Sequence, residues 1–406
     1  MPSRTPFEVK NSASGGKYSF LTRVLITRKQ STNSKLLVTH SCYLAKSSQL
    51  VDSILVYQSW VLFSVFCSFG SWLIVCLEVF LPAIASTKAV NIYHKMVNKP
   101  DIYACFEAAT ATWQYLVADP QTRDAVVIDS VLDFNPASSQ ISTDTADKLL
   151  GLISKYNLTV TRILETHAHA DHLTAATYLQ EKLASQGNPR PEICIGERIT
   201  EVQATFASKY QIKAAELANV FDKLFQDNEQ FMIGEIRAKV LHLPGHTPDH
   251  VGYLIGENVF TGDSIFNPDV GSARADFPGG SAATLYSSTQ TLLGLPKDYR
   301  LYVGHDYPPD ARAENDIGEK HKPYTTVKEQ REENKHVKEG TTEEEFVKFR
   351  LERDAVLGEP RLLHQSLQFN IRAGKLPEAT ESGDRFLRIP VKASNEFMSL
   401  MRGPKL

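Results

Sequence analysis

The chain has 406 residues, of which 42% are hydrophobic and 22% charged, so most of it is expected to fold around a substantial core. Its 47 acidic and 44 basic residues give a formal net charge of −3, which excludes a globally basic nucleic-acid-binding protein. The five cysteines show no metal-finger or redox spacing. In a chain of this length they favour a reducing compartment without a disulfide framework.

Residues 1–95 differ in composition from the rest and are expected to form an N-terminal extension. The first 53 residues contain eight Lys or Arg and only two acidic residues, a composition typical of an organelle transit peptide. An uncharged apolar run follows at 53–77, long enough to cross a bilayer, which needs about 20 residues. Three interpretations stay open: a membrane anchor, a mitochondrial transit peptide with a hydrophobic sorting segment, or upstream sequence fused to a shorter enzyme by an erroneous gene model. A cytoplasmic location is the alternative to the mitochondrial and membrane-anchored ones.

Residues 96–406 are expected to form one folded domain. In chain order the pattern predicts strands at 102–117 and 124–129, a helix at 143–156, a strand at 159–165, a helix at 173–184, a strand at 193–195 and a helix at 197–209. A hairpin at 231–243, a strand at 252–260, a helix at 282–293 and a strand at 301–304 follow. A charged loop at 308–342 leads into a C-terminal helical region that begins with a helix at 343–357. Strands alternating with helices, with hairpins interspersed, indicate sheets covered by helices.

A histidine cluster directly follows the strand at 159–165. It comprises His167, His169, Asp171 and His172. Burying these groups without partners would cost several kcal/mol, and imidazole with carboxylate is the ligand set that divalent transition metals take. The spacing aims His167 and His169 to one side and brings the other two to a neighbouring position. The cluster therefore predicts a metal site.

Three further strand ends carry His246, Asp263 and His305, each directly preceded by a glycine. Four loops that offer His and Asp toward one place predict a metal site on a rigid scaffold. Seven other histidines lack this context and are expected at the surface or in support of the ligands: His40, His94, His242, His250, His321, His336 and His364.

The motif order His-x-His-x-Asp-His, Gly-His, Gly-Asp, Gly-His resembles that of the metallo-β-lactamase superfamily. The resemblance covers about residues 100–310. It implies an α+β fold, the αββα sandwich, in which two mixed sheets pack face to face between helices. It also implies that 96–406 is a catalytic domain with its metal site at one edge of the sandwich.

Within that superfamily, the segments at 165–172, 262–277, 304–307, 344–347 and 370–374 look most like those of the persulfide dioxygenases. This resemblance implies one Fe(II) per chain, held by the metal ligands and catalytic residues His167, His246 and Asp263. Three coordination positions would remain open for the persulfide sulfur and O₂, and ferrous iron supplies electrons that zinc cannot. The implied reaction oxidises glutathione persulfide with O₂ to sulfite and glutathione, as in sulfide detoxification.

The same resemblance implies that Arg274, Tyr307 and Arg372 contact glutathione, whose carboxylates suit an Arg fork. The remaining donors would then orient the ligands or shape the pocket: His169, Asp171, His172 and His305. This chain departs from the family where Gly271-Ser272-Ala273 stands in place of a frequent Gly-Cys-Gly. The span 308–342 is also longer than in compact members.

The alternative is a thioester hydrolase of the glyoxalase II type, which cleaves hydroxyacylglutathione. The chain retains donors for two Zn, Fe or Mn ions, one on His167, His169 and His246, the other on Asp171, His172 and His305, with Asp263 bridging. Two metals would activate a water for attack on the thioester. The residues after each ligand favour the dioxygenase, while the ligands alone leave both reactions open. Neither implies a nucleic-acid partner, and any membrane contact would run through 53–77. A structural, non-enzymatic site is disfavoured because such sites are usually closed and rich in cysteine.

Overall fold

The computed structural model describes residues 99–310, 312 and 320–401, together with the backbone of three earlier strands. The chain divides into two compact units, Met1–Pro82 and Ala83–Leu406. The first contains an antiparallel sheet in the order β1 (Tyr18–Thr27), β2 (Lys35–Lys46), β3 (Tyr57–Ser64). The apolar run predicted at 53–77 includes β3, and its other residues lie outside the described ones, as does His94. Within the described residues no helix has the length and apolar character needed to cross a membrane.

The first sheet of the second unit has six strands in the order β12-β11-β9-β6-β5-β4. The strands β4, β5 and β6 pair antiparallel, whereas β6, β9, β11 and β12 pair in parallel. Their bounds are β4 (Asp101–Glu107), β5 (Thr112–Ala118), β6 (Asp124–Ile128), β9 (Thr159–Leu164), β11 (Glu192–Gly196) and β12 (Lys223–Phe225). Every residue of β5 is buried, as expected for a strand covered on both faces.

The second sheet has the order β13-β14-β15-β16-β17-β18, in which only β16 and β17 pair in parallel. Its strands are β13 (Gln230–Ile233), β14 (Ile236–His242), β15 (Val251–Ile255), β16 (Asn258–Phe260), β17 (Arg300–Tyr302) and β18 (Tyr324–Thr326). A small sheet of β10 (Leu173–Thr174), β7 (Val131–Asn135) and β8 (Gln140–Ser142) lies beside them.

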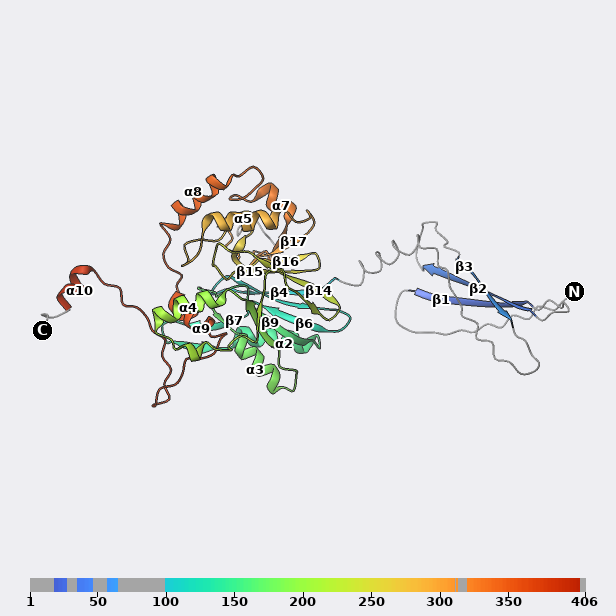
Figure 1. The fold of residues 1–406 in the computed structure, drawn as a ribbon, viewed down its shortest axis with the longest axis horizontal. Helices are drawn as coiled ribbons and strands as arrows, with labels where there is room; N and C mark the ends of the chain where they lie inside the picture. Colours follow the sequence, from blue (N-terminus) through green and yellow to red (C-terminus); the bar gives the residue numbers. More distant parts are fainter. Residues whose placement is uncertain are drawn as a thin grey trace. The chain divides into compact units, whose positions relative to one another are not determined.

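Helices cover the outer faces of the two large sheets. On one side lie α2 (Asp144–Lys155), α3 (Ala176–Ser185), α4 (Ile199–Tyr210) and α9 (Leu363–Asn370); on the other lie α5 (Ala282–Leu293), α7 (Val327–Glu333) and α8 (Glu343–Asp354) (Figure 1). Two single turns, η1 (Ala214–Glu216) and η2 (Gly262–Ser264), and an exposed α10 (Asn395–Met401) complete the described elements. The arrangement confirms the predicted αββα sandwich.

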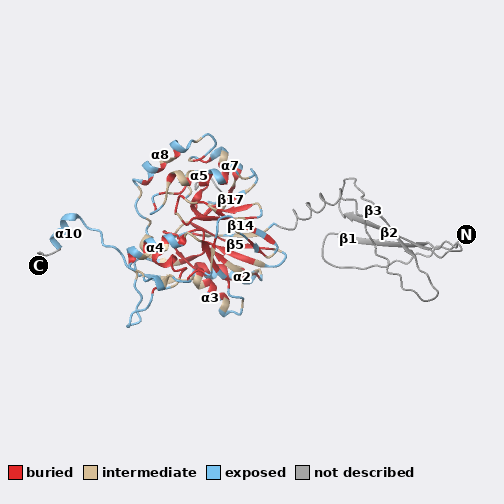
Figure 2. Cartoon of the chain, in the orientation of Figure 1, coloured by how far each residue is buried: buried red, intermediate tan, exposed pale blue. Residues whose placement is uncertain are grey.

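The apolar core fills the three spaces between these layers, and buried residues follow the sheets in Figure 2. Between the two sheets, the Tyr115 ring meets Phe260 edge-on at 5.0 Å and Tyr302 at 5.4 Å. Such aromatic contacts between the inner faces hold the two sheets in a fixed relation. That rigidity matters because loops from both sheets build the site described below.

Two predicted strands are hairpins instead. The stretch at 102–117 turns at 108–111 with Ala111 in the left-handed region (φ 56°), and the stretch at 252–260 turns at Gly256 (φ 62°). In each hairpin the strands on the two sides of the turn are apolar, and the first turn contains no Gly or Pro that would signal it. The charged span at 308–342 contains β18 and α7. A capping box at Thr326 and Glu329 starts α7 within the charged sequence.

Candidate metal centre

Four loops from the ends of strands in both sheets meet at one edge of the sandwich. His167, His169, Asp171 and His172 follow β9 of the first sheet; His246, Asp263 and His305 follow β14, β16 and β17 of the second. The sheets are joined at this edge because the Trp113 amide donates to the Gly304 carbonyl at 2.8 Å. The structure thus brings together all seven donors that the sequence predicts.

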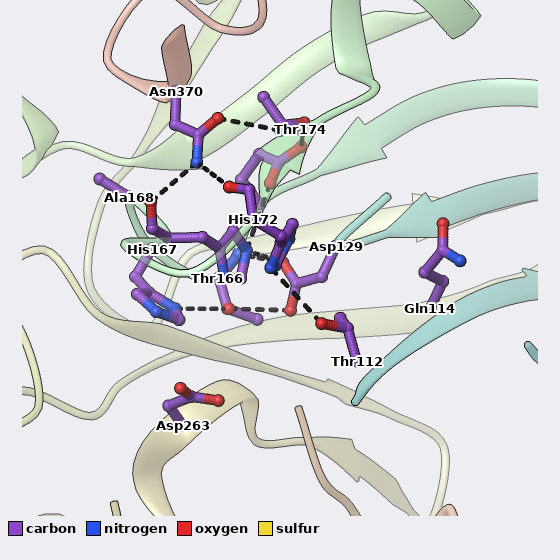
Figure 3. Close-up of polar contacts among 12 residues, drawn as sticks. Thr112, Gln114, Asp129, Thr166, His167, Ala168, His172, Thr174, Asp263 and Asn370 are labelled. Atoms are coloured by element: carbon purple, nitrogen blue, oxygen red, sulfur yellow. Dashed lines mark hydrogen bonds and ion pairs between the residues drawn. The ribbon is translucent and has the colours of Figure 1, made fainter. Parts of the chain in front are cut away.

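Close backbone packing presents Asp263. Gly262 has a φ of +48°, and a Cβ there would lie 2.6 Å from Thr166 Oγ1 and 2.8 Å from His250 Nε2. The Asp263 amide donates to His250 Nε2 at 2.9 Å. Since Gly262 is the residue that fits this contact, the turn holds the Asp263 carboxylate toward the opposite loop, where it faces His167 (Figure 3).

A hydrogen-bond chain fixes the orientation of the His167 ring. The Thr166 hydroxyl donates to Asp129 Oδ2 at 2.9 Å and can therefore accept from His167 Nδ1 at 3.0 Å. That leaves the lone pair on Nε2, which is buried without a hydrogen-bond partner. Burial and the neighbouring histidines hold the pKa of His167 well below its usual value, so the ring is neutral, as a ligand must be.

Two carboxylates hold the outer nitrogen of His169. Its Nε2 lies 3.1 Å from Asp129 Oδ1 and 3.4 Å from Glu165 Oε2, while Nδ1 is buried and unpartnered. Burial alone would lower the pKa of His169, but these carboxylates raise it well above the usual value. A carboxylate behind a histidine is the arrangement that directs its other nitrogen to a metal.

The three remaining rings follow the same pattern. His246 Nδ1 donates to the Arg274 carbonyl at 2.7 Å, and His305 Nδ1 to the Ala111 carbonyl at 3.2 Å. His172 Nδ1 lies 3.5 Å from Thr112 Oγ1, which is outside the donor set, and 3.3 Å from Oδ2 of the donor Asp171. In each ring Nε2 is the atom left for a ligand. Because five rings all have one nitrogen held from behind and the other turned inward, the donor set fits a metal centre.

The inward atoms form two groups. The first group has one donor atom from each of three residues, all within 4.8 Å of one another: His167, His246 and Asp263. The second group meets the same limit and comprises His169, Asp171 and His172. His305 connects the groups, since its Nε2 lies 3.3 Å from Asp171 Oδ2 and 3.5 Å from Asp263 Oδ2. Unpartnered buried polar atoms cost free energy, and a bound cation would satisfy them.

The metal donors open into a cleft of about 770 Å³, lined by Asp171, His246, Asp263 and His305 at its base. Of the expected glutathione contacts, Arg274 and Tyr307 line this cleft, but the Arg274 guanidinium pairs with Asp276 at 2.5 and 2.6 Å. Tyr307 is half exposed and its ring stacks on His305.

The structure does not bring Arg372 to the cleft. Its side chain is buried, bonds to Glu216 at 2.8 Å and donates to the Gln368 carbonyl. Its neighbour Asn370 is the residue of this segment that reaches the site. The Asn370 amide donates to the carbonyls of His169 and His172 at 2.8 Å and accepts from the Thr174 amide at 2.9 Å (Figure 3).

Sequence reasoning also missed Asp129 and Glu165 as the groups behind the ligands. Asp129 follows β6 directly, so a carboxylate at a strand end was a signal that could have found it. For Asn370, within the C-terminal region, no local pattern indicates a contact with a loop about two hundred residues earlier.

Comparisons with known proteins agree with this geometry. A profile described as the metallo-beta-lactamase superfamily matches residues 109–305. Glyoxylase B2 of Dictyostelium discoideum is 43% identical over 299 residues, which cover 73% of this chain and 98% of that protein. The mitochondrial persulfide dioxygenase ETHE1 of Homo sapiens is 30% identical over 205 residues, 50% of this chain and 66% of that protein. The crystal structure of ETHE1 from Myxococcus xanthus matches with a TM-score of 0.52 at 28% identity, over 68% of this chain and all of that one.

Proposed function

The chain belongs to the metallo-β-lactamase superfamily, and from its site we propose that it is a metal-dependent hydrolase of glutathione thioesters with two metal ions. The observation that carries the proposal is the set of seven inward-facing donors. A single iron needs three protein ligands, and three are present in His167, His246 and Asp263. The other four donors also direct a nitrogen or oxygen atom inward, and this favours a second ion.

The second group of donors has no evident role without a cation. His169 Nδ1 and His172 Nε2 are buried and unpartnered, and His305 Nε2 has only carboxylates before it. One ion would be held by the group His167, His246 and Asp263 and the other by the group His169, Asp171 and His172, with His305 between the two. The structure thus groups His169 with the second set of donors, whereas the sequence placed it with His167 and His246. When bound, such a pair supplies Lewis acidity and a water of lowered pKa.

The cleft that leads to these donors suits an anionic substrate. Lys335, Arg353 and Arg361 line it, are exposed, and form no ion pair within residues 99–310, 312 and 320–401. Glutathione carries two carboxylates, which free cations of this kind attract. We assign these three residues to binding the glutathione moiety, which directs the acyl–sulfur bond toward the base of the cleft.

The name of the Dictyostelium relative supports the same reaction class, since glyoxylase B2 is 43% identical over almost its whole length. The test uses the full chain, loaded separately with zinc and with iron. We expect hydrolysis of S-D-lactoylglutathione, followed by loss of thioester absorbance, with either metal. Absence of hydrolysis in both loaded forms would refute the proposal.

The second candidate is the persulfide dioxygenase. The compact group of His167, His246 and Asp263 favours it, as does the 30% identity to the human persulfide dioxygenase. His172→Asn separates the two, because it removes a donor that only the second ion needs. A hydrolase with two ions loses activity, whereas a dioxygenase with one iron keeps its O₂ uptake on glutathione persulfide. His364→Asn, which contacts Tyr210 away from the site, is the matched control.

A further inference from the structure

A buried ion pair on α8 lies directly behind the His246 loop. The Arg350 guanidinium donates to Asp354 Oδ1 through Nε at 3.1 Å and Nη2 at 2.6 Å. Both side chains are buried, Arg350 3% and Asp354 7% exposed. The pair lies outside the span 109–305 that matches the superfamily profile.

One peptide group connects this pair to the metal ligand. Asp354 Oδ2 accepts from the amide of Ala275 at 2.9 Å. The carbonyl of the same peptide, that of Arg274, accepts from His246 Nδ1 at 2.7 Å. Arg350 Nη1 also donates to the Ser272 carbonyl at 3.3 Å, which fixes the loop from its other end.

Hydrogen bonds on the two sides of a peptide reinforce each other, because the N–H and C=O are conjugated. An amide that donates to a carboxylate moves electron density onto its carbonyl oxygen, which then accepts more strongly. For His246 the effect resembles that of Asp129 on His169, except that the carboxylate acts through a peptide. A stronger acceptor at Nδ1 keeps the proton there and makes Nε2 a better ligand.

The position of Asp354 itself indicates a specific role. It is the last residue of α8, and a negative charge at a helix C-terminus opposes the helix dipole. Burying it adds a desolvation cost that the Arg350 contact offsets only in part. Thr342 and Glu345 form a capping box at the other end of α8, and Phe346 packs against Tyr286 of α5, so Asp354 is not needed to start or dock the helix.

We propose that Asp354 is a positioning residue for the metal ligand His246, acting through the Arg274–Ala275 peptide to hold the Nδ1 proton and strengthen Nε2 as a donor. The proposal requires His246 to be a metal ligand and holds for either reaction above. It rests to that extent on the proposed function. The histidine tautomer in the metal-free protein reports on it independently.

The test compares Asp354→Asn and Asp354→Ala in the full chain. Asparagine has one acceptor oxygen, so it can still accept from the Ala275 amide while its NH₂ group replaces the acceptor of Arg350. It therefore removes the charge and the ion pair but keeps the contact with the loop, whereas alanine removes that acceptor as well. If the alanine variant fails to fold, the asparagine variant still tests the proposal. Glu352→Gln, an exposed acidic residue of α8 with no described partner, is the matched control.

Two quantities are measured, the zinc affinity and the His246 tautomer, both at a temperature below the melting temperature of each variant. Competition with a chromophoric chelator gives the zinc affinity. We expect this affinity to fall by about 10-fold in Asp354→Asn and to stay unchanged in Glu352→Gln. Long-range ¹H–¹⁵N correlation in the metal-free protein gives the His246 tautomer, which should shift from pure Nδ1–H toward a mixture. A lower Tm with unchanged zinc affinity and unchanged tautomer would overturn the proposal. If zinc does not bind even the unmutated chain, the two-metal function fails, and the tautomer still decides the role of Asp354.

Discussion

Asp129 provides the sharpest prediction, because a single carboxylate supports two ligand histidines. Its Oδ1 accepts from the Thr166 amide at 2.7 Å and faces His169 Nε2 at 3.1 Å; its Oδ2 accepts from the Thr166 hydroxyl at 2.9 Å. In Asp129→Asn, the nearly isosteric amide can keep the Oδ1 contacts. At the Oδ2 position, however, an NH₂ group replaces the acceptor.

The consequence passes to His167. Once the Thr166 hydroxyl can no longer donate to residue 129, its remaining acceptor is His167 Nδ1, 3.0 Å away. That contact places the ring proton on Nε2, the atom that faces the metal. In the same substitution His169 loses the negative charge of residue 129, although Glu165 Oε2 remains 3.4 Å from its Nε2.

Hydrogen bonds to charged groups contribute about 1.5–3 kcal/mol. The loss of one such bond behind a ligand, converted at 1.4 kcal/mol per factor of ten, predicts zinc binding weaker by roughly 10- to 100-fold. The free energy of unfolding of the metal-free protein should fall by about 1–3 kcal/mol, since a buried donor loses its acceptor.

The assays are competition titration with a chelator and urea unfolding of the metal-free protein. Asp147→Asn is the control, because this exposed carboxylate accepts from Thr143 and Tyr178 far from the site. Zinc affinity in Asp129→Asn equal to that of the unmutated chain would refute the reasoning. It would mean that the chain Asp129–Thr166–His167 does not set the ligand tautomer.

Two further predictions address the cleft and the C-terminal segment. Arg353→Ala combined with Arg361→Ala should raise KM for S-D-lactoylglutathione by about 5-fold, because it removes roughly 1 kcal/mol of exposed charge pairing, and kcat should stay within twofold. Lys297 lies outside the cleft, so an equally large rise of KM in Lys297→Ala would contradict a specific role of the two arginines. Arg372→Met should lower the free energy of unfolding by about 3 kcal/mol, because it leaves Glu216 without its partner, and should leave KM unchanged. A raised KM at unchanged stability would instead support a direct contact with substrate.

The donors of the site were predictable because each follows a strand end, and strand ends of one layered fold converge. His167 needed no more than its place after a strand, and His246, Asp263 and His305 needed only that pattern and the glycine before each of them. The sandwich followed from the same motifs. Hairpin positions were less accessible, as at 108–111, because a continuous apolar run hides a turn that lacks Gly or Pro.

What the sequence could not reveal are contacts across long separations. Asn370 reaches the carbonyls of His169 and His172 only because α9 packs against β10. Asp354 lies behind His246 for a similar reason, through α8. The resemblance assigned Arg372 to the substrate, whereas the structure pairs it with Glu216, a residue that no sequence pattern connects with it.

The number of metal ions per chain tests the central claim most directly. The full chain, purified without oxygen, stripped and reloaded with zinc, is analysed by elemental mass spectrometry together with His172→Asn. We predict two ions per chain in the unmutated protein and one in the variant, because the seven donors divide into two groups joined by His305. One ion per chain in both proteins would contradict the account and favour a single-metal enzyme built on His167, His246 and Asp263.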